Sequence, residues 1–477
     1  ISQLRTGHRK LPSNPRAVHD IAAFFAGRCK DDYLRSALRQ FTEDPRLNLY
    51  VDEAVLTDII FDWFTGADKK EDSPASRFVS SFELFSPDSF PGNKTFSQGS
   101  IPEPNGVFAY YSNEGKRQAL RDMITYINSL HEPCNVLLFT DEAYDWLIED
   151  QAFSQWLNAA LGQLAAAGVT CERIQPPFND IEFTFSAIER WLPIYMAGAI
   201  EQYYYPWARD QLHRRTIFVV PGHIAMYSNS FYGEHEAPLT ALTRNADIVN
   251  VCGNEFAGIK QRCRPAISTF LADSDRIFTE AEAIAAIKDV GVYKTNSLSV
   301  NTLPHEINER IRRYGTAFTF RMCESFERRG RARAQVLREH IITDIMCLPK
   351  LADVLAGRVP VPGTQAIPQG ALYYTPQEYK AHLERILWHL DMYPNYQAVL
   401  TDAPHNDNII MYAKGNSHAM LVKRSSPFAV FSVAEPTMAT AFCNYLRRIA
   451  DEKLTVGARS ATIHRLREEL KLLTAAM

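Results

Sequence analysis

The sequence lacks the features of a membrane or secreted protein. No apolar run is long enough to span a bilayer, and no basic segment leads into an apolar one as in a signal peptide. Eight cysteines are scattered without a Cys-x-x-Cys pair, whereas disulfide-stabilised secreted domains are smaller and denser in cysteine. The net charge of −4 gives no overall attraction to nucleic acid or to anionic membranes. These absences predict a cytoplasmic protein with reduced thiols and no membrane contact.

Familiar catalytic and cofactor motifs are absent as well. The sequence has no phosphate-binding loop, no dinucleotide-binding glycine pattern, no nucleophile elbow and no His-Glu-x-x-His. The His-x-Lys-x4-Asp signature of phospholipase D also fails, because the match that begins at His8 ends on Pro15. The other candidate, His418, has Met420 where lysine is needed. We therefore expect no cofactor and no metal site, and an enzyme of unrecognised chemistry is kept as an alternative.

Pattern and composition divide the 477 residues into several parts, as expected for a chain too long for one core. Residues 1–66 are predicted to form a small all-α head, with Asn14 and Pro15 as a helix start signal. Residues 67–104 are rich in Lys, Asp, Ser, Pro and Gly and predict a linker. Residues 105–275 and 276–477 are predicted to be two halves of a large α/β body.

Short apolar runs bounded by turn residues predict the strands of this body. They lie at 108–111, 135–139, 169–174, 216–220, 224–227, 397–400, 409–413, 418–422 and 429–433. Amphipathic helices alternate with them, and residues 278–356 are predicted to be mostly helical. This alternation favours a mixed α/β fold. The similar stretches LLFTDEA (137–143) and AVLTDAP (398–404) raise a duplication of the two halves, which so short a similarity leaves open.

Polar and aromatic side chains near predicted strand ends are candidates for a ligand site. The candidate ligand-binding residues are Asp141, Glu142, Tyr203, Tyr204, Trp207 and His223. Open α/β sheets place ligand crevices at the carboxyl ends of their strands, which is where the acidic pair is expected. Helix capping explains Asp141 equally simply, and core packing explains the aromatic run.

Two predicted helices allow both a binding and a structural interpretation. ERRGRARAQVLREH contains five arginines between 328 and 338, which could bind phosphate. Interleaved glutamates favour a solvated helix face instead. The last predicted helix, 460–473, carries an apolar stripe that either forms a dimer interface or packs on the chain's own core.

The first ten residues, ISQLRTGHRK, combine short polar, amide and guanidinium side chains. Glutamine pairs with adenine and arginine with guanine in the major groove, while basic side chains contact phosphates. Gly7 suits the end of a helix. The candidate DNA-contacting residues are Ser2, Gln3, Arg5, Arg9 and Lys10.

This segment and the helix predicted at 14–25 resemble the second half of a lambda-repressor-like (XRE-type) helix-turn-helix domain. The resemblance covers the first 25 residues, without the two preceding helices of the family fold, and it implies DNA binding once those helices are present. It also implies a homodimer that reads two half-sites. The whole arrangement looks like bacterial regulators with such a head and a long α/β body.

The layout of the body resembles a phospholipase D-like fold without its catalytic motif. Together, the two resemblances predict a ligand-responsive transcription regulator whose α/β body senses an unknown small molecule and has no catalytic activity. The alternatives are an enzyme of unrecognised chemistry in the body and a protein-interaction scaffold.

Overall fold

The computed structural model describes most of the chain. The described residues are 15–29, 38, 56, 57, 60, 73–85, 99–142, 145–175, 181–206, 212–231, 239–271, 275–367, 370–401, 408–425, 428–454 and 457–477. The chain divides into two compact units, one of residues 1–77 with 180–185 and one of residues 78–179 with 186–477.

The smaller unit contains the helix α2 (Pro15–Ala26), which begins at the predicted proline. Its side chains Ala22 and Ala26 are buried against Leu56 and Ile60. The predicted helical start of this segment is therefore confirmed, and a small apolar cluster holds its described part together.

The larger unit is a mixed α/β structure, as predicted. Its described strands are β1 (Val107–Tyr110), β2 (Asn135–Thr140), β3 (Thr170–Gln175), β4 (Ile200–Tyr204), β5 (His213–Val220), β6 (Ile224–Phe231), β7 (Leu239–Thr243), β8 (Arg264–Leu271), β9 (Gly291–Lys294), β10 (Ile342–Cys347), β11 (Tyr396–Thr401), β12 (Ile409–Lys414), β13 (His418–Lys423) and β14 (Ala429–Val433). Every strand that the sequence predicted is present.

The described helices alternate with these strands. They are α5 (Pro74–Leu84), α6 (Ser112–Leu130), α7 (Asp145–Ile148), α8 (Gln151–Ala166), α9 (Ile181–Met196), α10 (Ala246–Lys260), α11 (Arg276–Ala286), α12 (His305–Arg312), α13 (Ala317–Val336), α14 (Leu351–Leu355), α15 (Pro376–Met392), α16 (Pro436–Asp451) and α17 (Ala458–Ala476), with short 3-10 turns η3 (Val300–Thr302) and η4 (Thr364–Ala366). In the part of the chain that the structure describes, no helix has the length and apolar character needed to cross a bilayer.

Capping residues explain where the long helices of the second half begin. The Thr375 hydroxyl accepts a hydrogen bond from the Glu378 amide at 3.2 Å, and the Glu378 carboxylate accepts one from the Thr375 amide at 2.9 Å. Pro376 at the first helical position of α15 completes the start signal. Thr316 and Thr319 make a similar reciprocal cap on α13.

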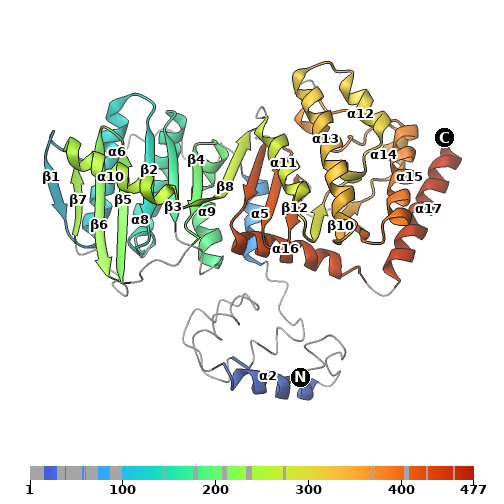
Figure 1. Ribbon diagram of the computed structural model, residues 1–477, viewed down its shortest axis with the longest axis horizontal. Helices are drawn as coiled ribbons and strands as arrows, with labels where there is room; N and C mark the ends of the chain where they lie inside the picture. The colour runs from blue at the N-terminus through green and yellow to red at the C-terminus, as the bar shows by residue number, and fades with distance from the viewer. Residues whose placement is uncertain are drawn as a thin grey trace. The chain divides into compact units, whose positions relative to one another are not determined.

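All fourteen described strands form one sheet, and its order repeats. The order is β1-β7-β6-β5-β2-β3-β4, followed by β8-β14-β13-β12-β9-β10-β11, so the second set is the first with every number raised by seven. In each set the last three strands are parallel and the remaining pairs are antiparallel. The body therefore consists of two halves with the same topology, side by side along one sheet (Figure 1).

The second half is turned over relative to the first. Strands β4 and β8 pair antiparallel where the halves meet, so equivalent strands run in opposite directions. Tyr195 of α9 contacts Phe431 of β14 with ring centroids 5.6 Å apart, and Phe78 of α5 contacts both Phe431 and Phe442 of α16. Helix α9 thus shares a sheet face with α16, and α5 packs between them.

The duplication rests on topology and not on the sequence similarity that first raised it. LLFTDEA includes the end of β2, and AVLTDAP includes the end of β11. In the repeated order β2 corresponds to β9 and β11 corresponds to β4, so the two stretches are not equivalent. The repeat begins at β8, and the segment 278–356 contains β9 and β10 in addition to the predicted helices. Helix α5 lies within the stretch predicted as a linker.

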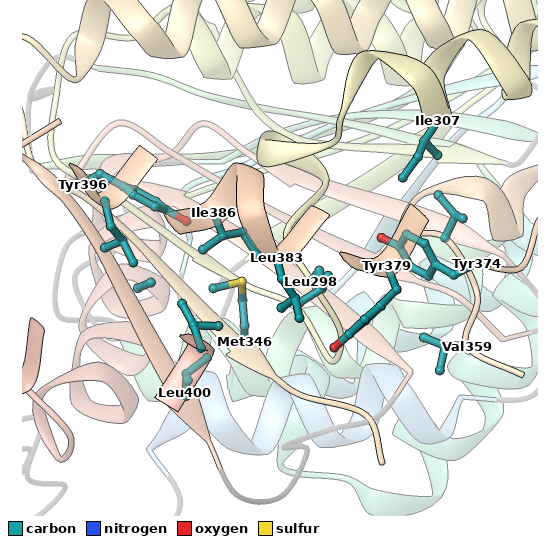
Figure 2. Packing of buried hydrophobic residues seen from close by; sticks show 14 of the residues in the cluster. Leu298, Ile307, Met346, Val359, Tyr374, Tyr379, Leu383, Ile386, Tyr396 and Leu400 are labelled. Carbon is teal, nitrogen blue, oxygen red and sulfur yellow. The ribbon is translucent and has the colours of Figure 1, made fainter. Parts of the chain in front are cut away.

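A large apolar core fills the space between the sheet and the helices of the second half. Figure 2 shows Met346 of β10, Leu400 of β11 and the α15 residues Leu383 and Ile386 within it. Helix α17 belongs to this core, because Leu466 and Leu473 are almost fully buried in it. The apolar stripe of the last helix therefore packs on its own chain, and a dimer interface is not needed to explain it.

Arg459, near the start of α17, fixes this helix to the outer strand. Its guanidinium donates hydrogen bonds to the backbone carbonyls of Tyr396 at 2.5 Å and Tyr393 at 3.1 Å, and also to that of Leu390. One side chain therefore caps the carboxyl end of α15 and occupies the first carbonyl of β11.

Candidate functional site

A buried ion pair lies at the end of β2 in the first half. The Nζ of Lys116 on α6 pairs with Glu142 and lies 3.1 Å from both hydroxyl oxygens of Thr216 and Ser228. Those hydroxyls donate to the Glu142 carboxylate at 2.5 and 2.7 Å. Burial raises the pKa of Glu142, but the Lys116 charge and these hydrogen bonds outweigh it and hold the pKa below its ordinary value. The group is a buried polar cluster in which Lys116, Thr216 and Ser228 all share Oε2 of Glu142, while Oε1 is buried without a hydrogen-bond partner among the described residues.

Asp141 has a structural role in the same place. Its Oδ1 accepts a hydrogen bond from the Arg215 amide at 2.5 Å, and its carbonyl accepts one from Arg214 at 2.8 Å. These bonds tie the end of β2 to β5. Asp141 does not cap α8, because Asp150 has that role and accepts from the Phe153 amide at 3.0 Å.

The other predicted ligand-binding residues do not join Asp141 and Glu142 in a pocket. Tyr204 is buried in β4, and the Tyr203 hydroxyl donates to Glu201 at 2.7 Å. His223 lies in the turn after β5, at the opposite end of the sheet from Asp141, because β2 and β5 are antiparallel. Its Nε2 is 3.9 Å from Glu132. Among the described candidates, Asp141, Glu142 and Tyr204 are buried by packing, and His223 lies at the other end of the sheet, so these residues do not line one pocket.

The remaining predicted site residues lie outside the described residues. These are Trp207 and the DNA-contacting candidates Ser2, Gln3, Arg5, Arg9 and Lys10. Their roles stay predictions.

A cavity of about 110 Å³ lies in the second half, between strands β9, β12 and β13 and helices α11 and α13. Its walls are mainly apolar and aromatic, and they include Phe278, Phe318, Phe326, Ile410, Met420 and Val422. Tyr293 and Tyr412 contribute rings from the sheet, with centroids 5.5 Å apart. Concave, mostly apolar cavities with a few polar groups are the usual form of a small-molecule site.

Arg329 of α13 is the polar group that distinguishes this cavity. Its guanidinium lies over the Phe326 ring, with Cζ 5.0 Å from the centroid. Among the described residues it makes no ion pair, and its Nε is buried without a hydrogen-bond partner. Burial lowers the pKa of Arg329, because the charged form is removed from water.

One helical turn further along, Arg333 has the ion pair that Arg329 lacks, although its Nε is also buried without a hydrogen-bond partner. Its guanidinium donates to the buried Asp344 carboxylate at 2.9 Å, which the Tyr396 hydroxyl also contacts at 3.0 Å. The prediction that the arginine-rich helix presents a solvated face is therefore wrong for Arg333, which is buried, and Arg329 is partly buried. It holds for Arg328, Arg331 and Arg338, which are exposed.

The sequence did contain the signal for the inward arginines. Met322, Phe326, Arg329 and Arg333 are spaced four, three and four residues apart, so they share one face of α13 with its apolar residues. The run of alternating charges concealed this stripe.

The cavity occupies the position that corresponds to the polar core of the first half. In the β5–β6 hairpin the last strand pair before the turn is Val220–Ile224, and in the β12–β13 hairpin it is Lys414–His418. Superposing these two pairs aligns the hairpins residue by residue. Counting back from these turns, Ile410 corresponds to Thr216 and Val422 corresponds to Ser228. The hydroxyls that bind Glu142 in one half are thus replaced by apolar cavity wall in the other.

A second cavity, of about 200 Å³, adjoins the first and shares Val300, Asn301 and Phe326 with it. At its edge the ligand atoms of His305, Glu309 and Glu327 lie within 4.8 Å of one another. Both carboxylates pair with Arg312, at 3.4 and 2.7 Å, so these residues form an ion-pair network.

Comparisons with known proteins give only distant likenesses. No family model matches the sequence, and no curated protein matches it. The solved structures that it resembles include polyphosphate kinase from Porphyromonas gingivalis (12% identity, TM-score 0.23, covering 77% of this chain and 55% of that one). The archaeal chromatin protein TrmBL2 has 11% identity and a TM-score of 0.24, covering 45% of this chain and 71% of that one. Yeast tyrosyl-DNA phosphodiesterase has 7% identity and a TM-score of 0.16, covering 70% and 90%. Scores this low show no shared function.

Proposed function

We propose that this chain is a cytoplasmic, ligand-responsive DNA-binding transcription regulator whose α/β body senses a small molecule and does not catalyse a reaction. The head supplies DNA contacts and the second half of the body supplies the ligand site. All eight cysteines are free thiols, which fits a reducing compartment.

The observation that carries the proposal is the cavity between β9, β12, β13 and helices α11 and α13. Its apolar walls and the Arg329 guanidinium, which makes no ion pair with any described residue, suit recognition of a small molecule. The described residues that line the cavity include no paired nucleophile and base, which acyl or phosphoryl transfer would need. The filled Lys116–Glu142 core offers no space for a substrate, so binding is favoured over catalysis.

DNA binding is tested with a longer chain, in which the first two helices of the helix-turn-helix family fold are joined in front of Ile1. We expect it to select a near-palindromic site from a random DNA library and to bind it as a homodimer. Arg5→Ala should then cost about 1–3 kcal/mol of binding free energy, mostly at one base position, as loss of a bidentate base contact does.

Arg9→Ala is the matched control for that experiment. It should weaken binding to all sequences alike and reduce the salt dependence, because a phosphate contact carries no sequence information. Equal effects of the two substitutions on every sequence would mean that the head is a basic anchor. Absence of any selected site would remove the regulator proposal.

A further inference from the structure

Glu282, whose charge acts on Arg329, and Asp344, the partner of Arg333, both form ion pairs with other arginines. Glu282 of α11 pairs with Arg321 at 2.6 Å and with Arg328 at 3.3 Å. Asp344 pairs with Arg333 at 2.9 Å. Arg329 therefore contributes a positive charge to the cavity that no described carboxylate balances at contact distance.

The Arg329 guanidinium is partly buried and its Nε is fully buried without a hydrogen-bond partner, which is costly, and an anion brought to it offsets that cost. A buried charge is tolerated when it is paired and hydrogen-bonded, and it is strongly unfavourable when it is not. The planar guanidinium presents a fork of N–H donors that matches a carboxylate bidentately. The free Nε of Arg329 is one such donor.

The first half shows how the same fold meets this need from within the chain. There, Glu142 supplies the carboxylate that balances the buried Lys116. Ile217 corresponds to Met411 in the hairpin alignment described above. Phe139 pairs with Ile217 and Lys294 pairs with Met411, so Lys294 corresponds to Phe139. Three residues further along each chain segment, Ser297 corresponds to Glu142. A serine stands where the first half has its internal carboxylate.

We propose that the cavity binds a small organic carboxylate, with its anionic group on Arg329 and its apolar body between Phe326 and the sheet. This inference rests on the ligand-sensing function proposed above and adds the chemical class of the ligand. The volume of about 110 Å³ approaches the roughly 150 Å³ of an engineered cavity that holds benzene, so the apolar body is about the size of one ring.

The test compares acids with their neutral amides, using phenylacetate and 3-phenylpropionate against phenylacetamide and 3-phenylpropionamide. Binding to the full chain is measured by isothermal titration calorimetry. We expect each acid to bind at least about tenfold more tightly than its amide, as expected for a charge-assisted hydrogen bond. This comparison on the unmodified chain needs no variant to fold.

Two substitutions locate the effect. Arg329→Leu should weaken acid binding at least about tenfold and leave amide binding unchanged, because only the charged contact is lost. Arg328→Leu is the matched control, since the neighbouring side chain is exposed and already paired with Glu324 and Glu282. It should leave acid binding unchanged.

Three results would overturn the inference in distinguishable ways. Equal binding of acids and amides, unaffected by Arg329→Leu, would establish a ligand site for neutral molecules and leave the regulator proposal in place. Equal weakening by Arg328→Leu would place the anion outside the cavity. Failure of both acids and amides to bind at millimolar concentration would reject the carboxylate class, while the DNA selection experiment decides the regulator proposal separately.

Discussion

The two halves of the body have the same strand order, but at the same interior position one half has a buried ion pair and the other has a cavity. In the first half, Thr216 and Ser228 on the sheet hold Glu142 against the buried Lys116. In the second half, the corresponding Ile410 and Val422 line a cavity that contains Arg329. One half closes this position with an ion pair of its own, and the other leaves it open with an unbalanced charge. The topology places the strands, whereas a few side chains decide whether the space is core or site.

This difference separates stability from binding between the halves. The filled core contributes to folding only if both members of the pair are present. The cavity gives up packing contacts and so has the character of a functional site, where local stability is lower. The predictions below test that division, beginning with the largest expected effect.

Lys116→Met should lower the free energy of unfolding by about 3–5 kcal/mol, because it leaves the Glu142 carboxylate buried without its cation. Urea denaturation at neutral pH measures the change. The double variant Lys116→Met/Glu142→Leu should recover at least half of the loss, since an apolar pair of similar volume can replace a buried ion pair.

The surface pair Lys260–Glu172 provides the matched control, because its side chains are 33% and 22% exposed. Lys260→Met should cost about 1 kcal/mol or less, as exposed ion pairs contribute little. If both lysine substitutions lower the free energy of unfolding equally, the Lys116–Glu142 pair is accessible to water and is not a buried ion pair.

Acid should destabilise the second half through two buried histidines. The His382 ring contacts the Tyr374 hydroxyl at 2.7 Å and Thr302 at 3.0 Å, and burial lowers its pKa to about 3 from an ordinary value of 6.5. Burial also lowers the pKa of His389 to about 4. Below pH 6.5 the unfolded chain gains protons that the folded chain does not, so stability present above pH 6.5 is lost as the pH falls toward these folded values.

Between pH 7 and pH 5, each histidine should cost about 2 kcal/mol of unfolding free energy. Urea denaturation at the two pH values measures the drop, and hydrogen exchange identifies which half opens first. His382→Gln should reduce the drop by about 2 kcal/mol relative to its own stability at pH 7. An unchanged drop in that variant would show that His382 is protonated in the folded protein.

Arg329→Leu should not lower the unfolding free energy by more than about 1 kcal/mol, because the lost charge has no described carboxylate partner and its removal relieves the cost of partial burial. Thermal unfolding without added ligand measures this smallest effect. A loss as large as that of Lys116→Met would mean that Arg329 belongs to a balanced core, and the comparison between the halves would fail.

Much of the fold could be predicted from the sequence, and the exceptions have a physical cause. Apolar runs such as TIFVV identified β5, and similar runs identified β12 to β14. Strands β9 and β10 were not predicted, because each contains a charged residue, Lys294 or Asp344, that is typical of a solvent-exposed segment but is buried here. Their partners come from other parts of the chain, and a local pattern does not contain them.

The candidate site was harder to predict because it depends on register between distant segments. Only the pairing of β9 with β12 brings Tyr293 beside Tyr412, and only the packing of α13 on that face points Arg329 at both. Glu142 was predicted as a ligand-binding residue, but the structure pairs it with Lys116, 26 residues earlier on α6. Charge balance across a fold is a property of the packed structure and not of any one segment.

The contact between β4 and β8 joins the last strand of one half to the first strand of the next. Further copies could be added to the sheet by the same contact without closing it. The outer strand β11 corresponds to β4 and the outer strand β1 corresponds to β8, which makes the two rims of the sheet complementary in the manner that generates open fibres. Arg459 occupies one rim, because its guanidinium already holds the Tyr396 carbonyl that an incoming strand would need. The side chain that anchors α17 therefore also makes this edge strand less available for pairing with a second copy of the chain.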